Sequence, residues 1–326
     1  MKIAMFDTKP YDMDSFEALK PEGMKIKYFE TRLTEDTVSL AKGYDAVIVF
    51  VNDDVNKTVL EALYSLGVKL VALRCAGYNN VDLKAAKGKI KVIRVPAYSP
   101  HAVAEHTMGM LLTSIRRIHK AYIRSKDFNF SLNGLTGFNL NGRTMGIVGT
   151  GKIGKAFVSI CKGFGMNVIC YDLYPDKELS VTYTTLNDLF EKSDIISLHC
   201  PLTKENYHMI NEDTISRMKK GVVIINTSRG SLIDAEALLE GIKAKKIGAA
   251  CLDVYEEESE LFFEDHSGRI VQDDIIARLI SMPNVLITSH QAFLTEEALS
   301  NIANTTIDGI EAYFNNGNLQ NEVKSE

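Results

Sequence analysis

The distribution of apolar residues along the chain predicts a protein in which strands and helices alternate. In the first third, five short apolar runs are separated by segments of helix length, and these runs lie at 2–7, 25–30, 46–51, 69–75 and 89–95. Apolar runs of this length are typical of strands that are buried in a parallel sheet. The pattern therefore favours an α/β fold in which helices flank the sheet.

The pattern changes at residue 99, where a longer segment of helical character begins. Ser99 suits a helix N-cap, and Pro100 suits the first helical position. Basic residues gather toward the other end, where the helix dipole favours positive charge: Arg116, Arg117, His119 and Lys120. We expect one long helix over 99–122 that joins two domains.

A second series of six apolar runs follows, at 143–149, 167–172, 194–200, 221–227, 248–254 and 284–290. Six strands separated by helix-length segments are what a dinucleotide-binding domain requires. The segment 295–317 is again helical in character, and we expect it to return to the first domain. The predicted fold is α/β with two Rossmann-like domains: a discontinuous substrate domain of residues 1–99 and 296–326, and an NAD-binding domain of residues 100–295.

Composition and charge exclude several classes of partner. The 326 residues include 45% hydrophobic and 24% charged residues, with a net charge of -5 and no long basic cluster, so we expect no nucleic-acid partner. No apolar run approaches the roughly 20 residues that cross a bilayer, and Asp7 leaves no room for a signal peptide. The five cysteines are scattered without a CxxC pair, which predicts a cytoplasmic protein without a metal site.

One motif of the second domain points to a dinucleotide. A GxGxxG pattern lies between a predicted strand and a predicted helix, and it consists of Gly149, Thr150, Gly151, Lys152, Ile153 and Gly154. Such glycines let a pyrophosphate approach the N–H groups at a helix N-terminus. Asp172, 18 residues after Gly154, is placed to bind ribose hydroxyls and to repel a 2′-phosphate. We expect NAD rather than NADP; the alternative is a structural turn and a surface aspartate.

Polar residues follow the other predicted strands of this domain, at the edge where an open parallel sheet binds its ligands. Arg229 and His290 each follow a strand, and a glutamate cluster at 256–258 follows another. Taken singly, these groups have plain alternatives: a surface ion pair, a structural histidine and a solvated acidic loop. Further residues near these strand ends are predicted to bind the cofactor: His199, Cys200, Pro201, Thr227 and Asp253.

A cation, a carboxylate and an imidazole at one edge form a coherent chemical set. The planar fork of arginine matches a substrate carboxylate. An imidazole gives or takes the proton of a carbonyl/alcohol pair near neutral pH, and a neighbouring carboxylate orients it and favours its charged form. After Arg229, we expect Gly230 to give the backbone the freedom to turn away.

Seven segments together resemble the D-2-hydroxyacid dehydrogenase family: RCAGYNNVDL, VPAYSPHAVAEH, GIVGTGKIG, HCPLT, NTSRGSLID, LDVYEEE and SHQAF. They lie between residues 74 and 293, in the order of the family's motifs. YSPHAVAEH and ELFFEDHSGRI resemble the D-lactate dehydrogenase branch in particular. The resemblance implies that Arg229 binds the substrate, that His290 is the catalytic acid/base and that Glu258 is its carboxylate partner.

The same resemblance implies further residues and an activity. Ala76 and Gly77 would donate backbone N–H groups to the substrate carboxylate, and Tyr98 and Phe293 would line the substrate pocket. The implied reaction is the NADH-dependent reduction of pyruvate to D-lactate, in an active site in the interdomain cleft. The alternatives are a related enzyme for a bulkier 2-oxo acid, glyoxylate or hydroxypyruvate, and an NADH-sensing regulator. Members of the family usually associate through the nucleotide domain, so we expect a homodimer or homotetramer.

Overall fold

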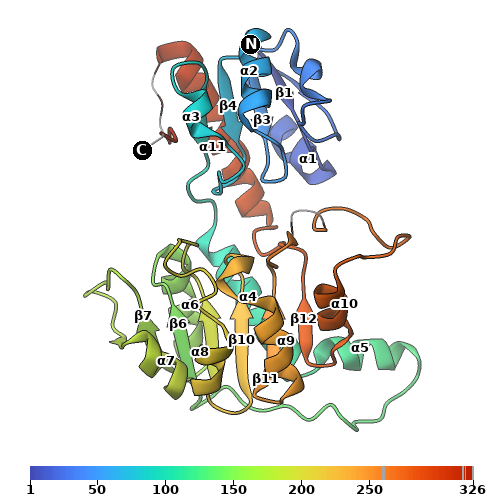
Figure 1. Ribbon diagram of the computed structural model, residues 1–326, viewed down its shortest axis with the longest axis vertical. Helices are drawn as coiled ribbons and strands as arrows, with labels where there is room; N and C mark the ends of the chain where they lie inside the picture. The colour runs from blue at the N-terminus through green and yellow to red at the C-terminus, as the bar shows by residue number, and fades with distance from the viewer. Residues whose placement is uncertain (259–260, 318, 320, 325–326) are drawn as a thin grey trace. The chain divides into compact units, whose positions relative to one another are not determined.

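The computed structural model describes residues 1–258, 261–317, 319 and 321–324. The chain forms two compact units: Met1–Ser99 with Phe293–Glu326 (unit 1), and Pro100–Ala292 (unit 2). Each unit is built on a parallel sheet with helices around it (Figure 1), which confirms the predicted fold class. The chain returns to unit 1 at Phe293, three residues before the expected boundary. The reason is the packing of the Phe293 ring, whose centroid lies 6.3 Å from that of Phe50 and 6.1 Å from that of Tyr98.

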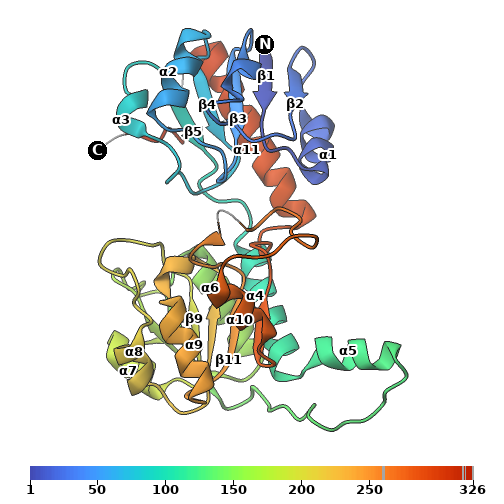
Figure 2. The same ribbon diagram turned by 45° about the vertical axis from the view of Figure 1, so that its right-hand side comes forward.

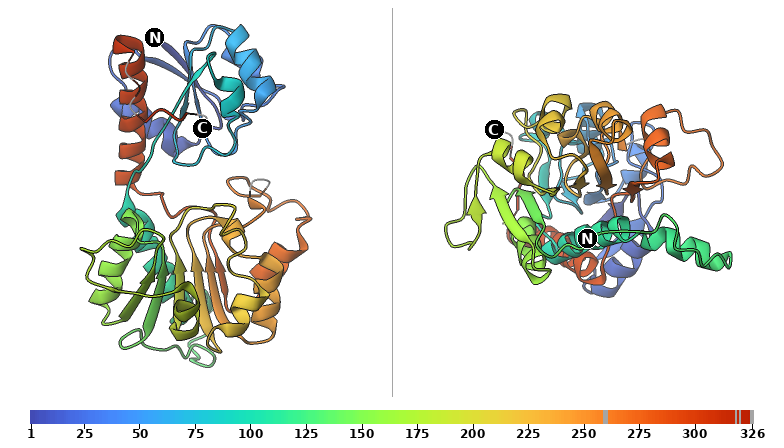
Figure 3. Two further views of the ribbon diagram at one scale, coloured as in Figure 1. Left: turned by 60° about the vertical axis from the view of Figure 1, so that its left-hand side comes forward. Right: turned by 90° about the horizontal axis from the view of Figure 1, so that it is seen from below.

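Within the described residues, unit 1 contains a five-stranded parallel sheet with the order β2-β1-β3-β4-β5. Its strands are β1 (Lys2–Met5), β2 (Lys25–Tyr28), β3 (Ala46–Val49), β4 (Leu70–Leu73) and β5 (Lys91–Arg94), and each lies inside a predicted apolar run. Its helices are α1 (Pro10–Leu19), η1 (Val38–Ala41), α2 (Lys57–Ser65), α3 (Leu83–Ala86) and α11 (Glu296–Asn316). Helix α11 packs against α1 and β4 and runs alongside the unit 1 sheet (Figure 3), as expected for a segment that returns to the first domain.

In the part of unit 2 that the structure describes, the sheet has seven parallel strands in the order β12-β11-β10-β9-β6-β7-β8. The strands are β6 (Thr144–Val148), β7 (Asn167–Tyr171), β8 (Thr182–Tyr183), β9 (Ile195–Leu198), β10 (Val222–Asn226), β11 (Ile247–Leu252) and β12 (Val285–Ile287). The helices are α4 (Pro100–Ile115), α5 (Ile118–Lys126), α6 (Lys152–Gly163), α7 (Leu186–Lys192), α8 (Glu212–Arg217), η2 (Gly230–Leu232), α9 (Ala235–Lys243) and α10 (Asp274–Ser281). The sequence did not predict β8, because a two-residue strand at the sheet edge leaves no apolar run.

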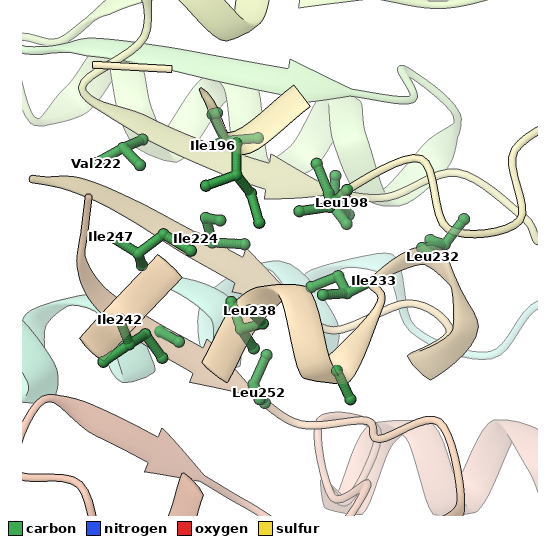
Figure 4. Close-up of a cluster of buried hydrophobic side chains, with 14 of the residues drawn as sticks. Ile196, Leu198, Val222, Ile224, Leu232, Ile233, Leu238, Ile242, Ile247 and Leu252 are labelled. Carbon is green, nitrogen blue, oxygen red and sulfur yellow. The ribbon is translucent and has the colours of Figure 1, made fainter. Parts of the chain in front are cut away.

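The strand β10 shows why its sequence is continuously apolar. Successive side chains of a strand point to opposite faces of the sheet. Val222 and Ile224 lie in the core cluster to which α9 contributes, whereas Val223 and Ile225 lie in the cluster formed with α4 and α6. Figure 4 shows the first cluster, with the α9 side chains beside those of β9, β10 and β11. Because both faces are covered, all five residues of β10 are buried.

The expected long helix over 99–122 is wrong in one respect, because it is two helices. Helix α4 begins at Pro100, as predicted, but ends at Ile115, and α5 starts only after Arg117, which has a left-handed φ of 55°. At Gly137, a Cβ atom would lie 2.2 Å from the carbonyl oxygen of Ile115, so the chain crosses the end of α4 at this point. Helix α5 then projects from the body of unit 2 (Figure 2). Among the described residues, no helix combines the length and apolar character needed to cross a membrane.

Candidate active site

Strand β6 leads into the glycine turn, and the turn leads into α6. Gly149 has a φ of 96°, and a Cβ at this position would lie 2.7 Å from the backbone of His199 and Cys200. A Cβ on Gly154 would lie 2.0 Å from the carbonyl oxygen of Gly149, so only glycine lets α6 begin this close to the turn. Gly151, the N-cap of α6, has no side-chain cap and no atom within 4 Å of its Cβ position. The first N–H groups of α6 are therefore available to an anion, as a pyrophosphate requires.

Asp172 follows β7 and is tied to the same turn. Its Oδ2 accepts hydrogen bonds from the backbone N–H and the hydroxyl of Thr150, at 2.6 and 3.0 Å, and its Oδ1 accepts one from Tyr174 N at 2.8 Å. An ionised carboxylate has about four acceptor positions. The partly exposed Asp172 therefore keeps capacity for ribose hydroxyls. The remaining motif residues, Lys152 and Ile153, form the first positions of α6.

His199, the first residue after β9, is held by neighbours inside unit 2. Its Nε2 lies 2.9 Å from the Ser197 hydroxyl, and its ring centroid lies 5.0 Å from that of Phe157. Burial lowers the pKa of His199 to about 3, so the imidazole is neutral at physiological pH. The side chain contributes no charge to the cofactor region, and its backbone forms one wall of the glycine turn.

The residues that follow β9 and β10 are hydrogen-bonded to each other and to α4. The carbonyl of Cys200 accepts a hydrogen bond of 2.6 Å from the Ser228 hydroxyl. The hydroxyl of Thr227 lies 2.9 Å from that of Thr107 on α4, and both residues are buried. Pro201 is exposed. Burial raises the pKa of the Cys200 thiol to about 11, so the group is a neutral thiol here.

The turn after β10 presents Arg229. Asn226, the buried last residue of the strand, closes this turn: its Nδ2 donates to the Arg229 carbonyl at 2.8 Å, and its Oδ1 accepts from Ser228 N at 3.0 Å. The Nη1 of Arg229 donates to the Ser228 carbonyl at 2.7 Å. In the part of the chain that the structure describes, no carboxylate forms an ion pair with Arg229. Its guanidinium fork is therefore available to a ligand carboxylate.

The reason we gave for Gly230 is wrong. Gly230 is not among the residues with a positive φ, so no left-handed turn requires it. A Cβ at this position would instead lie 2.1 Å from the backbone carbonyl of Tyr255. The glycine is needed because the loop after Arg229 packs directly against the backbone of the loop that follows β11.

His290 and Glu258 form a hydrogen-bonded pair. The Nδ1 of His290 donates to Oε1 of Glu258 at 2.9 Å, and Oε2 of Glu258 accepts from Tyr255 N at 2.9 Å. Glu258 is thus the member of the glutamate cluster that contacts His290, whereas Glu256 contacts His208 at 2.6 Å. This arrangement orients the imidazole and leaves its Nε2 as the nitrogen for a substrate.

Comparison with known proteins identifies the family of this chain. The family model described as "D-isomer specific 2-hydroxyacid dehydrogenase, NAD binding domain" matches residues 108–292, more than half of the chain. The chain belongs to this family. The match confirms both the predicted family and the predicted cofactor, NAD. Within the described residues, no group of three or more His, Cys, Asp or Glu side chains could hold a metal ion.

Individual relatives are similar to this dehydrogenase over almost their full length. D-lactate dehydrogenase of Escherichia coli (strain K12) is 54% identical over 315 residues, which cover 95% of this chain and 96% of that protein. The apo-structure of D-lactate dehydrogenase from Escherichia coli has a TM-score of 0.91, with 50% identity, and covers 99% of this chain and 100% of its own. The NAD-complexed enzyme from Lactobacillus delbrueckii ssp. bulgaricus has a TM-score of 0.84, with 31% identity, and covers 99% and 100%.

In this dehydrogenase, Asp253 holds the loop that carries His290. Its side chain is fully buried, and its carboxylate accepts hydrogen bonds from the Thr288 hydroxyl at 2.5 Å and from the N–H groups of Gln291 and Ala292 at 2.9 Å. Its backbone carbonyl accepts from His290 N at 2.7 Å. We expected a contact with the cofactor from Asp253. In the structure its side chain is buried and bonded to the His290 loop, and the contact with the cofactor stays a prediction.

Unit 1 holds the residues proposed for the substrate carboxylate in a short loop after β4. The Ala76 carbonyl accepts a hydrogen bond of 2.8 Å from Nη1 of Arg94, and the Gly77 carbonyl accepts one of 3.3 Å from Cys75 Sγ. Both Ala76 and Gly77 are partly exposed. The loop is therefore held through its carbonyl groups.

The aromatic residues of unit 1 form a connected set. The Phe293 ring lies between those of Tyr98 and Phe50, as the ring distances given above show. The Tyr98 carbonyl accepts a hydrogen bond of 2.9 Å from Asn301 on α11. The two predicted pocket residues are thus in contact with each other, and Phe50 joins them.

Three residues of the site were not predicted. Phe50 gave no signal, because it continues the apolar run of β3. Asn226 could have been noticed as the first polar residue after four apolar ones. Phe263, whose ring centroid lies 5.9 Å from that of His290, is separated from it by 27 residues, and only the folded chain reveals this contact.

Gly151→Ala tests the cofactor site. The new Cβ meets no protein atom, so we expect unfolding to be unchanged, but it enters the space in front of α6. We expect the dissociation constant for NADH, measured by fluorescence titration, to rise about tenfold or more, which is a loss of about 1.4 kcal/mol. Gly163→Ala, at the far end of the same helix and equally free of neighbours, is the control. Unchanged NADH affinity in Gly151→Ala would contradict the assignment.

Proposed function

We propose that the protein is an NAD-dependent D-lactate dehydrogenase that reduces pyruvate with NADH. One observation carries the proposal: the His290–Glu258 pair follows strands of the same parallel sheet whose neighbouring strand presents Arg229. The sheet order β12-β11-β10 brings the carboxyl ends of these three strands side by side. Full-length similarity to a D-lactate dehydrogenase supports the choice of substrate.

We assign cofactor binding to unit 2, together with Arg229 and His290, and the other proposed substrate-binding residues to unit 1. The residues of the glycine turn fit the cofactor, because the turn leaves the N-terminus of α6 open and Asp172 keeps free acceptor positions. Bound NADH supplies the reducing equivalent for the reaction. Cys200, Pro201 and Thr227, which follow the neighbouring strands β9 and β10, are assigned to the same cofactor region.

His290 supplies the proton in this proposal. Because Nδ1 is bonded to Glu258, the protonated ring offers Nε2–H to the carbonyl oxygen of the substrate and transfers this proton as the alcohol forms. The carboxylate of Glu258 stabilises the imidazolium before the transfer and keeps the ring in one orientation. In the reverse reaction, the neutral ring accepts the proton of D-lactate at the same nitrogen.

Arg229 binds the substrate carboxylate through its planar fork. The backbone N–H groups of Ala76 and Gly77 are proposed as further donors to this carboxylate, and Tyr98 and Phe293 as residues that line the pocket around the substrate methyl group. The substrate bears one negative charge and one small apolar group. The cationic fork of Arg229 complements the negative charge, and the aromatic surface complements the apolar group.

The assay that tests the proposal follows NADH absorbance with pyruvate, 2-oxoisocaproate, glyoxylate and hydroxypyruvate in parallel. We expect the highest kcat/KM with pyruvate and D-lactate as the product by chiral chromatography. His290→Ala is the control for contaminating activity, since it should bind NADH and turn over poorly. A preference for 2-oxoisocaproate would identify a sibling activity, and NADH binding without turnover of any 2-oxo acid would identify a regulator.

Arg229→Lys tests the carboxylate site. A lysine keeps the charge but cannot form two parallel hydrogen bonds. We expect KM for pyruvate to rise and kcat to fall, with kcat/KM lower by about 10- to 100-fold, the equivalent of about 1.5–3 kcal/mol. Arg217→Lys on α8, where the arginine pairs with Asp213 on the surface, should leave the kinetics unchanged. Near-normal kinetics in Arg229→Lys would refute the role.

We also propose that two or more copies of the chain associate through the projecting arm of unit 2. Six large apolar side chains on α5 and the segment after it are 53–83% exposed: Ile118, Tyr122, Ile123, Phe128, Phe130 and Leu132. An apolar group of this size on a projecting segment is typical of a protein–protein interface. A second copy is the occupant we favour, giving a homodimer or homotetramer. A cytoplasmic location stays a prediction.

Ile123→Glu tests the arm. A charge placed in an apolar interface should weaken association, so we expect sedimentation velocity to show a smaller species than for the unmodified protein. Tyr64→Glu, at a similarly exposed position on α2 of unit 1, should keep the original mass. A monomeric unmodified protein, or equal masses for all three, would contradict the proposal.

A further inference from the structure

His208 lies in a cluster of polar side chains that the proposed reaction does not use. Its Nε2 is 2.6 Å from Oε1 of Glu256, and its Nδ1 is 3.8 Å from Oδ2 of Asp234. The ring of Tyr207 stacks on the imidazole with centroids 3.9 Å apart, and the Tyr207 hydroxyl donates to the same Glu256 oxygen at 3.0 Å. The imidazole is thus held between carboxylates from two other loops.

Backbone hydrogen bonds join the segment that carries His208 to the loop that follows Arg229. His208 N donates to the carbonyl of Ser231 at 2.9 Å, and Ile210 N donates to the carbonyl of Leu232 at 3.0 Å. In the opposite direction, the N–H of Asp234 donates a hydrogen bond of 2.9 Å to the carbonyl of Ile210. Ser231 is two residues beyond Arg229, so this ladder fixes the chain directly after the arginine.

The side chain of His208 contacts the loop that carries Glu258. Glu256 lies two residues before Glu258, in the turn where Glu258 accepts the N–H of Tyr255. The same turn is where a Cβ on Gly230 would collide with the backbone of Tyr255. The two loops are therefore in direct backbone contact, and the His208–Glu256 bond bridges them at this contact.

The backbone of His208 also indicates that its position is imposed by these partners. Its φ of 51° is in the left-handed region, which a residue with a Cβ atom adopts at a cost. The carbonyl of His208 accepts a hydrogen bond of 2.9 Å from Asn211 Nδ2, which stabilises the turn on the other side. A strained residue persists where the surrounding contacts determine its conformation.

We propose that His208, acting with Glu256, is a positioning residue that holds the Arg229 loop in register with the Glu258 loop. The proposal rests on the proposed function, because it assigns a task to residues that serve Arg229 and Glu258. The imidazole donates a hydrogen bond to Glu256 and, when protonated, offsets the negative charges that face it, namely Glu256 and Asp234. Without it, Glu256 keeps only the longer bond from the Tyr207 hydroxyl to this segment. The arginine fork then shifts relative to the His290–Glu258 pair.

The test is a double-substitution cycle on the full-length protein with His208→Ala, Glu256→Ala and both together. We expect each single substitution to raise KM for pyruvate about fivefold, with a smaller fall in kcat. The dissociation constant for NADH should stay within about twofold, because the glycine turn is untouched. The double variant should be no worse than the worse single one, since both remove the same bond.

Two further variants separate positioning from general stability. His208→Gln keeps a donor for Glu256 without the charge, and we expect it to restore part of the KM lost in His208→Ala. Lys192→Gln, which breaks an exposed pair with Asp188 on α7 of the same unit, should leave KM unchanged. If His208→Ala does not fold, His208→Gln and Glu256→Gln form the cycle instead.

The outcomes distinguish this proposal from the proposed function. If the unmodified protein turns over none of the four 2-oxo acids, the proposed function fails. If it is active and the single substitutions leave KM unchanged, or if their effects add in the double variant, the positioning role is overturned. A lower melting temperature with unchanged KM would likewise overturn it and assign the cluster to stability alone.

Discussion

The buried carboxylate of Asp253 is the interaction on which the candidate site depends. An ionised carboxylate inside a protein is costly unless hydrogen bonds replace its water. Burial by itself would raise the pKa of Asp253, but His106, Thr288 and the N–H groups of the following loop hold it below its usual value. These bonds, with the bond from His290 N to the Asp253 carbonyl, fix the loop after β12. His290 accordingly adopts a left-handed φ of 52° and reaches Glu258.

The parallel sheet supplies the second constraint. Because neighbouring strands run in the same direction, the loops after β10, β11 and β12 lie along one edge and pack against one another. This close packing of the loops explains why a glycine is needed at position 230 and an asparagine at position 226. The glycine lets the arginine loop approach the backbone of Tyr255, and the asparagine closes the turn from inside the sheet. An apolar side chain could replace neither residue, because it would collide at position 230 and could form no hydrogen bonds at position 226.

Local patterns predicted the elements whose causes are local. The apolar runs predicted most strands because strands buried on both faces are largely apolar, as in the first four residues of β10. The glycine motif and Asp172 were recognisable because the turn, the helix start and the carboxylate predicted to bind the ribose have a fixed spacing. Features that depend on distant residues were not predictable. Examples are the break after Ile115, where Gly137 crosses the helix end, and the contact between Phe263 and His290.

The sequence by itself determined the α/β class and the NAD cofactor, and it predicted Arg229 and His290 as site residues, since each depends on a short motif with its own chemical reason. The choice among Glu256, Glu257 and Glu258 was implied by resemblance, and the tertiary structure shows the contacts that separate them. Glu258 bonds to His290, whereas Glu256 bonds to His208. The folded chain also decided that Asp253 is buried and that Gly230 serves a close approach. These tasks depend on which loops meet at the sheet edge, and no spacing along the chain contains that information.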